Sequence, residues 1–187
     1  MNKYDIFTKD KGNTVLAVKD GGEVKVFTPK LEVYPFIIHF AIVSIVILYA
    51  FLMRSYGFRF NILSYLIVFP LGLFILFLIM IYPTMRYEFR QDALYLIYGP
   101  VKRKIDYKDI VSVIKANLKY DFSSTGWKLP GYALFSIYYV DRGYVWMCAT
   151  RLLNDILLIT TAQNKLFGVT PQDEKGFISE LEKRTQK

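Results

Sequence analysis

Cysteine and histidine are almost absent from this sequence of 187 residues, which holds one of each, Cys148 and His39. Zinc sites are built from clusters of these two residue types, so we expect no metal site. A cysteine–histidine nucleophile pair would need the two side chains in contact and a third group to orient the imidazole. His39 lies in a long apolar run, far from Cys148 in sequence. We interpret both residues as packing residues or, for His39, as a residue near the membrane–water interface.

The motifs of nucleotide binding and acyl transfer are also missing. The sequence contains no Walker loop, no dinucleotide-binding glycine fingerprint and no Gly-x-Ser-x-Gly elbow. Its acidic residues are scattered, and we interpret Asp106 and Asp109 as a turn and cap pair before a strand that starts at Ile110. Without an acid/base constellation we expect no enzyme activity, no catalytic residue and no cofactor.

Two long stretches, residues 33–53 and 62–82, contain no Asp, Glu, Lys or Arg. At about 1.5 Å per residue, each is long enough as a helix to cross a hydrocarbon core of about 30 Å. A chain this short could not supply the polar shell that two such helices need in a soluble protein, and the first run starts too late for a cleaved signal peptide. Only residues 54–61 separate the runs, which predicts an antiparallel transmembrane hairpin.

Basic residues predict how this hairpin is oriented. The short loop carries Arg54 and Arg59, for a charge of +2, whereas residues 1–32 carry +1 and residues 83–187 carry +5, which together make the +8 of the chain. Lys and Arg outside the loop outnumber those within it near the apolar runs. The positive-inside rule then places both termini in the cytoplasm of a multi-pass protein in the plasma membrane.

The segment before the hairpin, residues 1–32, has the alternating pattern of β-structure. Apolar positions alternate on both sides of Gly21 and Gly22, over residues 14–29, which predicts a β-hairpin. Two isolated strands are marginal in water. We therefore expect this β-hairpin to dock on a larger domain, with a mobile segment as the alternative.

The segment after the second apolar run, residues 83–187, reads as a string of short strands followed by one helix. A helix is predicted over 171–184, with Thr170 as N-cap and Pro171 at its first position. Its apolar stripe can cover an open end of a sheet. The strands are predicted at 85–92, 94–99, 101–107, 110–116, 133–140, 144–150, 155–161 and 165–170.

About seven antiparallel strands followed by one amphipathic helix is the layout of a pleckstrin-homology-like (PH-like) barrel. Residues 126–181 carry a Lys-Leu-Pro-Gly loop, a strand ending in Ala-Thr, a Leu-Leu-Ile-Thr-Thr strand, a Phe-Gly-Val-Thr-Pro step and a Phe-containing helix in this order. In these features residues 84–184 resemble the bacterial and archaeal PH-like domains of small membrane proteins. The resemblance implies a membrane α-helical hairpin joined to a mainly-β (α+β) PH-like barrel. Phosphoinositide binding does not carry over, because no residue matches that lipid-binding motif.

Basic residues near the membrane exit suggest a contact with lipid. Lys102, Arg103 and Lys104 form a tight triplet, and Arg86 and Arg90 follow the second apolar run closely. Our hypothesis is that these five hold the domain against anionic headgroups, at up to about 1 kcal/mol each. The alternative is that they set topology and solvate a strand edge. Nucleic acid is not expected, because Tyr and Phe are spread along the strands as a core requires.

Two classes of function remain. The first is a membrane-anchored, non-catalytic interaction module, a scaffold or regulatory subunit, that binds a protein partner, anionic headgroups or both. Trp127 and Tyr132, at the polar loop 121–131, are its candidate partner contacts, although Trp127 could instead anchor the loop. The second class is a transporter or channel component, in which the hairpins would form a homo-oligomer.

Overall fold

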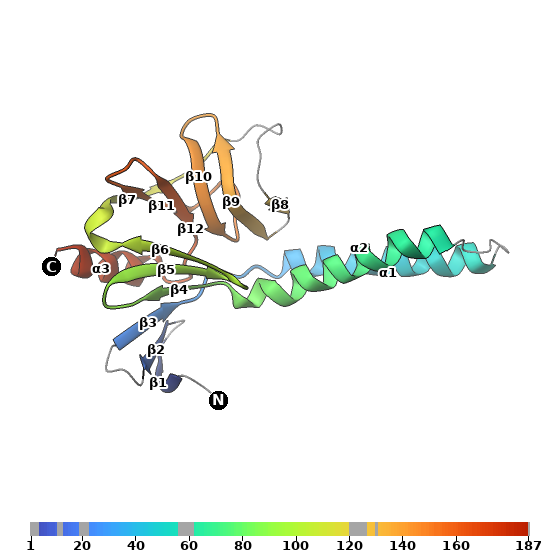
Figure 1. Cartoon of the computed structure of the whole chain (residues 1–187), viewed down its shortest axis with the longest axis horizontal. Helices are drawn as coiled ribbons and strands as arrows, with labels where there is room; N and C mark the ends of the chain where they lie inside the picture. Colours follow the sequence, from blue (N-terminus) through green and yellow to red (C-terminus); the bar gives the residue numbers. More distant parts are fainter. Residues whose placement is uncertain are drawn as a thin grey trace.

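The computed structural model describes residues 4–10, 13–18, 23–55, 62–119, 127–129 and 131–186. Over these residues the chain forms two β-sheets, a hairpin of two long helices and one C-terminal helix (Figure 1). The long helices project from one side of the sheets, and the C-terminal helix lies on the opposite side (Figure 1).

The first sheet has the strand order β1-β2-β3-β4-β5-β6, and every neighbouring pair is antiparallel. β2 and β3 are the two strands expected around Gly21 and Gly22, whose turn lies outside the described residues. β1 was not predicted. The bounds are β1 (Tyr4–Asp10), β2 (Asn13–Val18), β3 (Glu23–Phe27), β4 (Arg86–Phe89), β5 (Ala93–Tyr98) and β6 (Val101–Asp106).

β3 pairs with β4, so the segment before the long helices joins the sheet that follows them. Lys25 lies opposite Phe89, and Phe27 lies opposite Tyr87. The N-terminal strands thus dock on the larger domain instead of standing alone. The helical hairpin is inserted between two paired strands.

The second sheet has the order β7-β11-β12-β10-β9-β8. β12 returns from β11 as a tight hairpin and inserts between β11 and β10, so that it runs parallel to β10. The expectation that all strands are antiparallel was wrong for the β10–β12 pair. The expected number of about seven strands was also too low, because nine described strands lie between β3 and the C-terminal helix. The bounds are β7 (Ile110–Ala116), β8 (Trp127–Leu129), β9 (Tyr132–Tyr139), β10 (Gly143–Ala149), β11 (Ile156–Thr161) and β12 (Leu166–Val169).

The long helices are α1 (Tyr34–Ser55) and α2 (Ile62–Ile81), close to the two uncharged stretches of the sequence. Pro70 lies inside α2. Counted over the residues that the structure describes, none of its helices is long and apolar enough to cross a membrane.

The C-terminal helix α3 (Glu174–Thr185) starts later than predicted. Its N-cap is Asp173, whose Oδ1 accepts a hydrogen bond from the backbone N–H of Gly176 at 2.9 Å. Thr170 cannot serve as the cap, because the backbone there is extended and bonded to residues before α1. Lys30 N donates to Thr170 O at 2.8 Å, and Gln172 N donates to Thr28 O at 2.9 Å.

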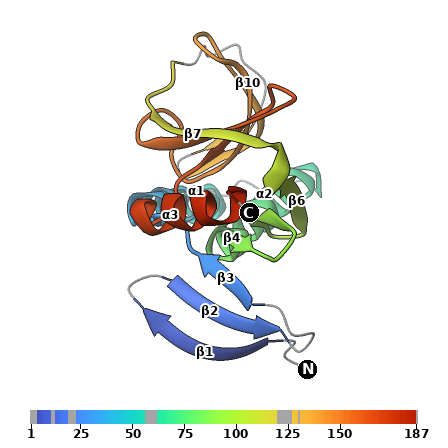
Figure 2. The same ribbon diagram turned by 90° about the vertical axis from the view of Figure 1, so that its left-hand side faces the viewer.

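The main core lies where the two sheets and α3 meet, and Figure 2 shows α3 between the sheets. Four rings form its centre: Phe27 from β3, Tyr87 and Phe89 from β4, and Phe177 from α3. All four are fully buried, and Phe177 has edge-to-face contacts with the other three at centroid distances of 5.0–5.7 Å. Such ring pairs stabilise a core beyond the area they bury.

Tyr87 also joins the sheets by hydrogen bonds. Its hydroxyl donates to the carbonyl oxygen of Cys148 on β10 at 2.8 Å and accepts from the backbone N–H of Thr170 at 3.1 Å. A second core lies within the curled second sheet and includes Ile137, Tyr139 and Met147. The sheets are therefore fixed to each other by buried contacts at β4 and β10.

Candidate functional site

The five basic residues predicted to meet lipid headgroups do not share one face. Along β6, Lys102 and Lys104 alternate with Arg103, so the two lysines lie on one face of the first sheet and Arg103 lies on the other. Arg86 is in register with Ile97, which in turn is in register with Lys102. Arg90 follows the far end of β4. The register therefore places Arg86, Lys102 and Lys104 on one face, with Arg90 bonded to Glu88 on the same face, and only Arg103 lies on the other. Headgroup binding by these residues stays a prediction.

Carboxylates already pair with three of these five residues. Glu88 is 1% exposed; it accepts from Arg86 Nε at 2.8 Å and from Arg90 Nε at 3.0 Å. Burial alone would raise the pKa of Glu88, but the hydrogen bonds from the two guanidinium groups outweigh it and lower the pKa. Glu88 is therefore ionised at neutral pH, as the centre of a charge cluster.

Lys104 lies between two aspartates, 2.9 Å from Asp106 and 2.9 Å from Asp92. Hydrogen bonds to Asp106 and Asp92 raise the pKa of Lys104. Asp106 precedes a short 3₁₀ turn, Tyr107–Asp109, but its side chain makes no cap hydrogen bond there, so the expected cap was wrong. Among the described residues this leaves Lys102 and Arg103 without a carboxylate partner.

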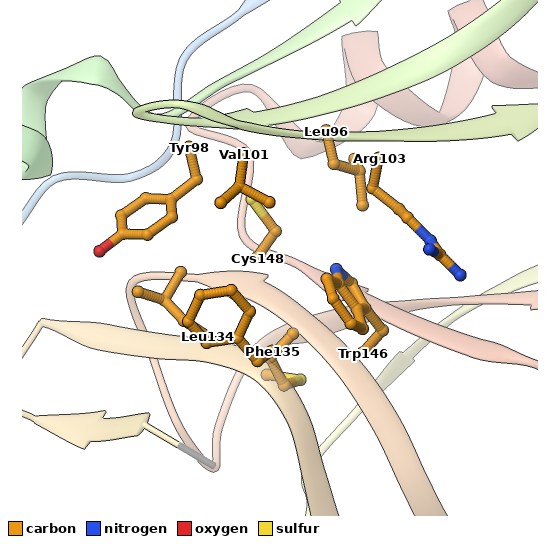
Figure 3. A pocket seen from close by; sticks show the side chains of 9 residues that line it. Leu96, Tyr98, Val101, Arg103, Leu134, Phe135, Trp146 and Cys148 are labelled. Carbon is orange, nitrogen blue, oxygen red and sulfur yellow. The ribbon is translucent and has the colours of Figure 1, made fainter.

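Arg103 points into a groove between the two sheets. In Figure 3, one side of the groove is formed by β5 and β6, with Leu96, Tyr98 and Val101. The opposite side is formed by β9 and β10, with Leu134, Phe135 and Trp146, and Cys148 lies between the two sides. The guanidinium of Arg103 lies 5.0 Å from the ring centre of Trp146. Phe135 contacts Tyr98 and Trp146 edge-to-face, at 6.4 and 5.9 Å. One end of the groove is therefore aromatic.

The other end of the groove is polar. Beyond Arg103 the groove widens to a cavity of about 90 Å³, whereas the aromatic end encloses only about 10 Å³. Pockets for small ligands usually hold several hundred Å³, which is more than either end offers. The polar end is lined by Lys104, Asp106, Asp109, Thr161, Gln163 and Lys165.

Phe135 is held in the groove by an unusual backbone. Its φ is +64°, in the left-handed region that a bulky residue rarely adopts. Consecutive residues of a regular strand point to opposite faces, yet Leu134 and Phe135 both line the groove. Such strain amounts to about 1–3 kcal/mol and concentrates at functional sites.

Cys148 and His39 do not form a reactive pair. Cys148 is fully enclosed, and burial raises the pKa of its thiol to about 12, which disfavours the thiolate that reacts. His39 is 6% exposed, and its Nδ1 lies 2.5 Å from the carbonyl oxygen of Pro35, one turn earlier in α1. Over the described residues there is no group of His, Cys, Asp or Glu able to hold a metal ion.

Comparison with known families supports the fold. A family model described as a bacterial PH domain matches residues 85–185, more than half of the chain. The chain belongs to the bacterial PH domain family. No curated protein and no solved structure matches it. Membership makes a non-catalytic interaction module the coarse function of this domain.

The matched PH domain region starts at residue 85, but the structural unit includes β3. The chain after β3 is also bonded to this region: Thr150 Oγ1 donates to Lys30 O at 2.7 Å, and Arg151 Nη2 lies 2.7 Å from Glu32 Oε1. The PH domain of this protein is therefore discontinuous in sequence, with the helical hairpin inserted between β3 and β4.

Trp127 and Tyr132 lie on β8 and β9 of the PH domain, on either side of the turn at Gly131. Trp127 is in register with Leu134, and Leu129 is in register with Tyr132. Their side chains lie outside the described set, so their role as partner contacts stays a prediction. The sequence did not point to the groove residues, since no local pattern shows that Tyr98, Phe135 and Trp146 meet.

Proposed function

We propose that this protein is a membrane-tethered, non-catalytic interaction module, in which α1 and α2 cross the bilayer and hold the PH domain at its cytoplasmic surface. One observation supports the proposed membrane tether. Large apolar side chains are exposed along the helices: Phe40 by 73%, Ile45 by 64%, Phe51 by 66% and Met80 by 66%. Soluble proteins rarely expose such continuous apolar surface, whereas acyl chains would cover it.

The length of the two uncharged stretches of the sequence supports the same proposal. The longest uninterrupted runs with described side chains are 34–49 in α1 and 70–77 in α2. The uncharged sequence extends beyond them, to residue 53 in α1 and over 62–82 in α2. A helix of about 20 apolar residues spans a bilayer.

Charge alone would make a weak attachment. Lys102 and Arg103, the two of the five candidate headgroup residues that no described carboxylate pairs with, would contribute about 1 kcal/mol each at an anionic surface. A contact of this size can orient the domain but cannot hold it on a membrane. The proposed attachment therefore resides in the hairpin, with headgroup contact at Lys102 as a minor addition.

Alkaline carbonate washing of membranes tests the tether. The full chain is expected to stay with the membrane pellet, because an inserted hairpin resists this treatment and a charge contact does not. Release into the supernatant would refute the proposal. The control is the double variant Lys102→Ser, Arg103→Ser, which should also remain in the pellet because it keeps the hairpin.

Cysteine labelling tests the orientation. In a Cys148→Ala background, Ser55→Cys at the end of α1 is expected to react with a membrane-impermeant maleimide on intact cells, because it would lie outside. Gln91→Cys, in the exposed turn between β4 and β5, should react only after lysis. The reverse pattern would place the PH domain outside the cell.

A further inference from the structure

β6 is an open edge of the first sheet. The turn at Gly99 and Pro100 leaves two residues between β5 and β6, so Tyr98 and Val101 form the hydrogen-bonded pair next to it. Pairs alternate along an antiparallel ladder, and the backbone N–H and C=O of Lys102 and Lys104 therefore point away from β5. In the described part of the chain no backbone group pairs with them.

The groove runs along this edge. Val101 and Arg103 line its aromatic end, and Arg103, Lys104, Ile105 and Asp106 line its polar end. An open strand edge beside a groove can hold an extended chain, because the edge supplies backbone hydrogen bonds and the groove accepts alternate side chains. Volumes of about 10 and 90 Å³ are too small for a whole small ligand, so an occupant would lie along the edge and pack on the partly exposed rings.

The charges of the polar end favour an acidic occupant. Lys104 and Asp106 neutralise each other, which leaves Arg103 and Lys165 against Asp109. Lys165 Nζ donates to Gln163 Oε1 at 2.7 Å and is mostly exposed to water. The residues that line the polar end therefore carry a net charge of +1. Lys102 adds a second positive charge at the edge, and Asp92, the other partner of Lys104, offsets one of the two.

We propose that an extended segment of a partner protein adds to β6 as a further strand of the first sheet. An aromatic or large aliphatic side chain of that segment packs against Phe135 and Trp146, and an acidic side chain lies beside Arg103 and Lys165. This deepens the proposed function, on which it rests, by naming the surface of the interaction module and the chemistry of its partner.

The strained backbone of Phe135 supports this role. A φ of +64° turns its ring to the same face as Leu134 and so adds an apolar surface beside Trp146. Both rings remain partly exposed although they pack against the core. Contacts with Tyr98 and Trp146 offset part of this strain in the free domain, and the exposed part of the ring offers a bound side chain an edge to pack on.

Proline at Lys102 tests the strand addition directly. Because the N–H of Lys102 points away from β5, Lys102→Pro removes an edge donor and leaves the β5–β6 ladder intact. Lys102→Thr is the matched control, since it removes the same charge but keeps the donor. The fluorescence of Trp146, in a Trp127→Phe background of the full chain in detergent, reports binding in the groove.

The probes are two blocked hexapeptides of threonine, each with phenylalanine at the second position and either glutamate or lysine at the fourth, so that both side chains face the groove. The acidic peptide is expected to bind at least about tenfold more tightly than the basic one, and Lys102→Pro should weaken it by about tenfold or more. Lys102→Thr should weaken it by less than about threefold. Equal binding to wild type and Lys102→Pro, or no binding of the acidic peptide at about 1 mM, overturns the proposal.

Two further outcomes separate this proposal from others. A dimeric native mass in detergent that becomes monomeric in Lys102→Pro would assign the edge to a second copy of this chain and overturn the partner named above. Release of the chain by carbonate would refute the tether and leave the peptide result unaffected, so the two failures are distinguishable.

Discussion

Replacing Phe27 by alanine should destabilise the whole PH domain, although Phe27 lies before the helical hairpin and outside the region matched by the family. Its ring is fully buried, with centroids 5.2 Å from Phe89 and 5.4 Å from Phe177. Removal of a buried phenylalanine side chain costs about 3–5 kcal/mol. That is a large fraction of the roughly 5–15 kcal/mol that stabilises a typical domain.

Urea denaturation of the full chain in detergent, followed by tryptophan fluorescence, measures this loss. Phe40→Ala is the matched control, because Phe40 is 73% exposed on α1 and the same change should shift stability by no more than about 0.5 kcal/mol. If Phe27→Ala shifted the midpoint no more than Phe40→Ala does, β3 would not be part of the folding unit. The discontinuous domain described above would then be wrong.

Three other predictions concern single side chains. Glu88→Gln should cost about 2 kcal/mol in urea denaturation, after allowance for solvent screening of Arg86 and Arg90, because it removes the carboxylate between them. In the wild type, Glu88 contributes fully to the free energy of unfolding above its unfolded pKa of 4.5, and this contribution is lost as the pH falls through its lower folded pKa. Glu88→Gln should therefore make the free energy of unfolding fall less steeply at acid pH. Phe135→Gly should be more stable than Phe135→Ala by about 1–2 kcal/mol in the same assay, because glycine relieves the positive φ; the usual strand ranking, alanine above glycine, would contradict the strain. Cys148 should react with iodoacetamide at pH 8 at least about a hundredfold more slowly in the native protein than in urea, and fast native labelling would show that the groove opens.

Elements that depend on local pattern could be predicted from the sequence. The uncharged runs gave α1 and α2 within a residue or two, because a helix of this length needs no tertiary partner to be recognised. The alternating segments gave eight of the nine strands after α2, and Gly21 with Gly22 marked the β2–β3 pair. β1, with the mixed sequence YDIFTKD, carries no clear alternation and was missed.

Features that depend on distant contacts could not be predicted. Alternation shows that residues 165–170 form a strand, but not that β12 inserts beside β10 and runs parallel to it. The start of α3 depends on backbone bonds from residues 28–30, which hold Thr170 and Pro171 extended. The groove depends on the approach of two sheets and on the φ of Phe135, neither of which leaves a local signal.

Under the proposed topology, the insertion of the helices between β3 and β4 determines which end of the groove faces the bilayer. Tyr82 at the end of α2 accepts a hydrogen bond from Glu32 N at 3.3 Å, which ties the two helix ends together. Gly131, at a φ of +82°, lies so close to Pro35 that an added Cβ would be 2.5 Å from its ring, so only glycine fits there. These contacts fix the PH domain relative to the helices.

The β5–β6 turn is held in the same way. A Cβ on Gly99 would lie 3.3 Å from Ile81, the last residue of α2, so the turn packs on the base of the hairpin. Tyr98 and Val101, which flank the turn, line the aromatic end of the groove, and Lys165 lies at the other end. Under the proposed topology, a partner strand on β6 would therefore start at the membrane with its apolar residue and continue into the cytoplasm with its acidic one. We therefore expect the partner segment to be juxtamembrane, because under this topology such a chain would leave the bilayer near Gly99, where the open edge of β6 begins.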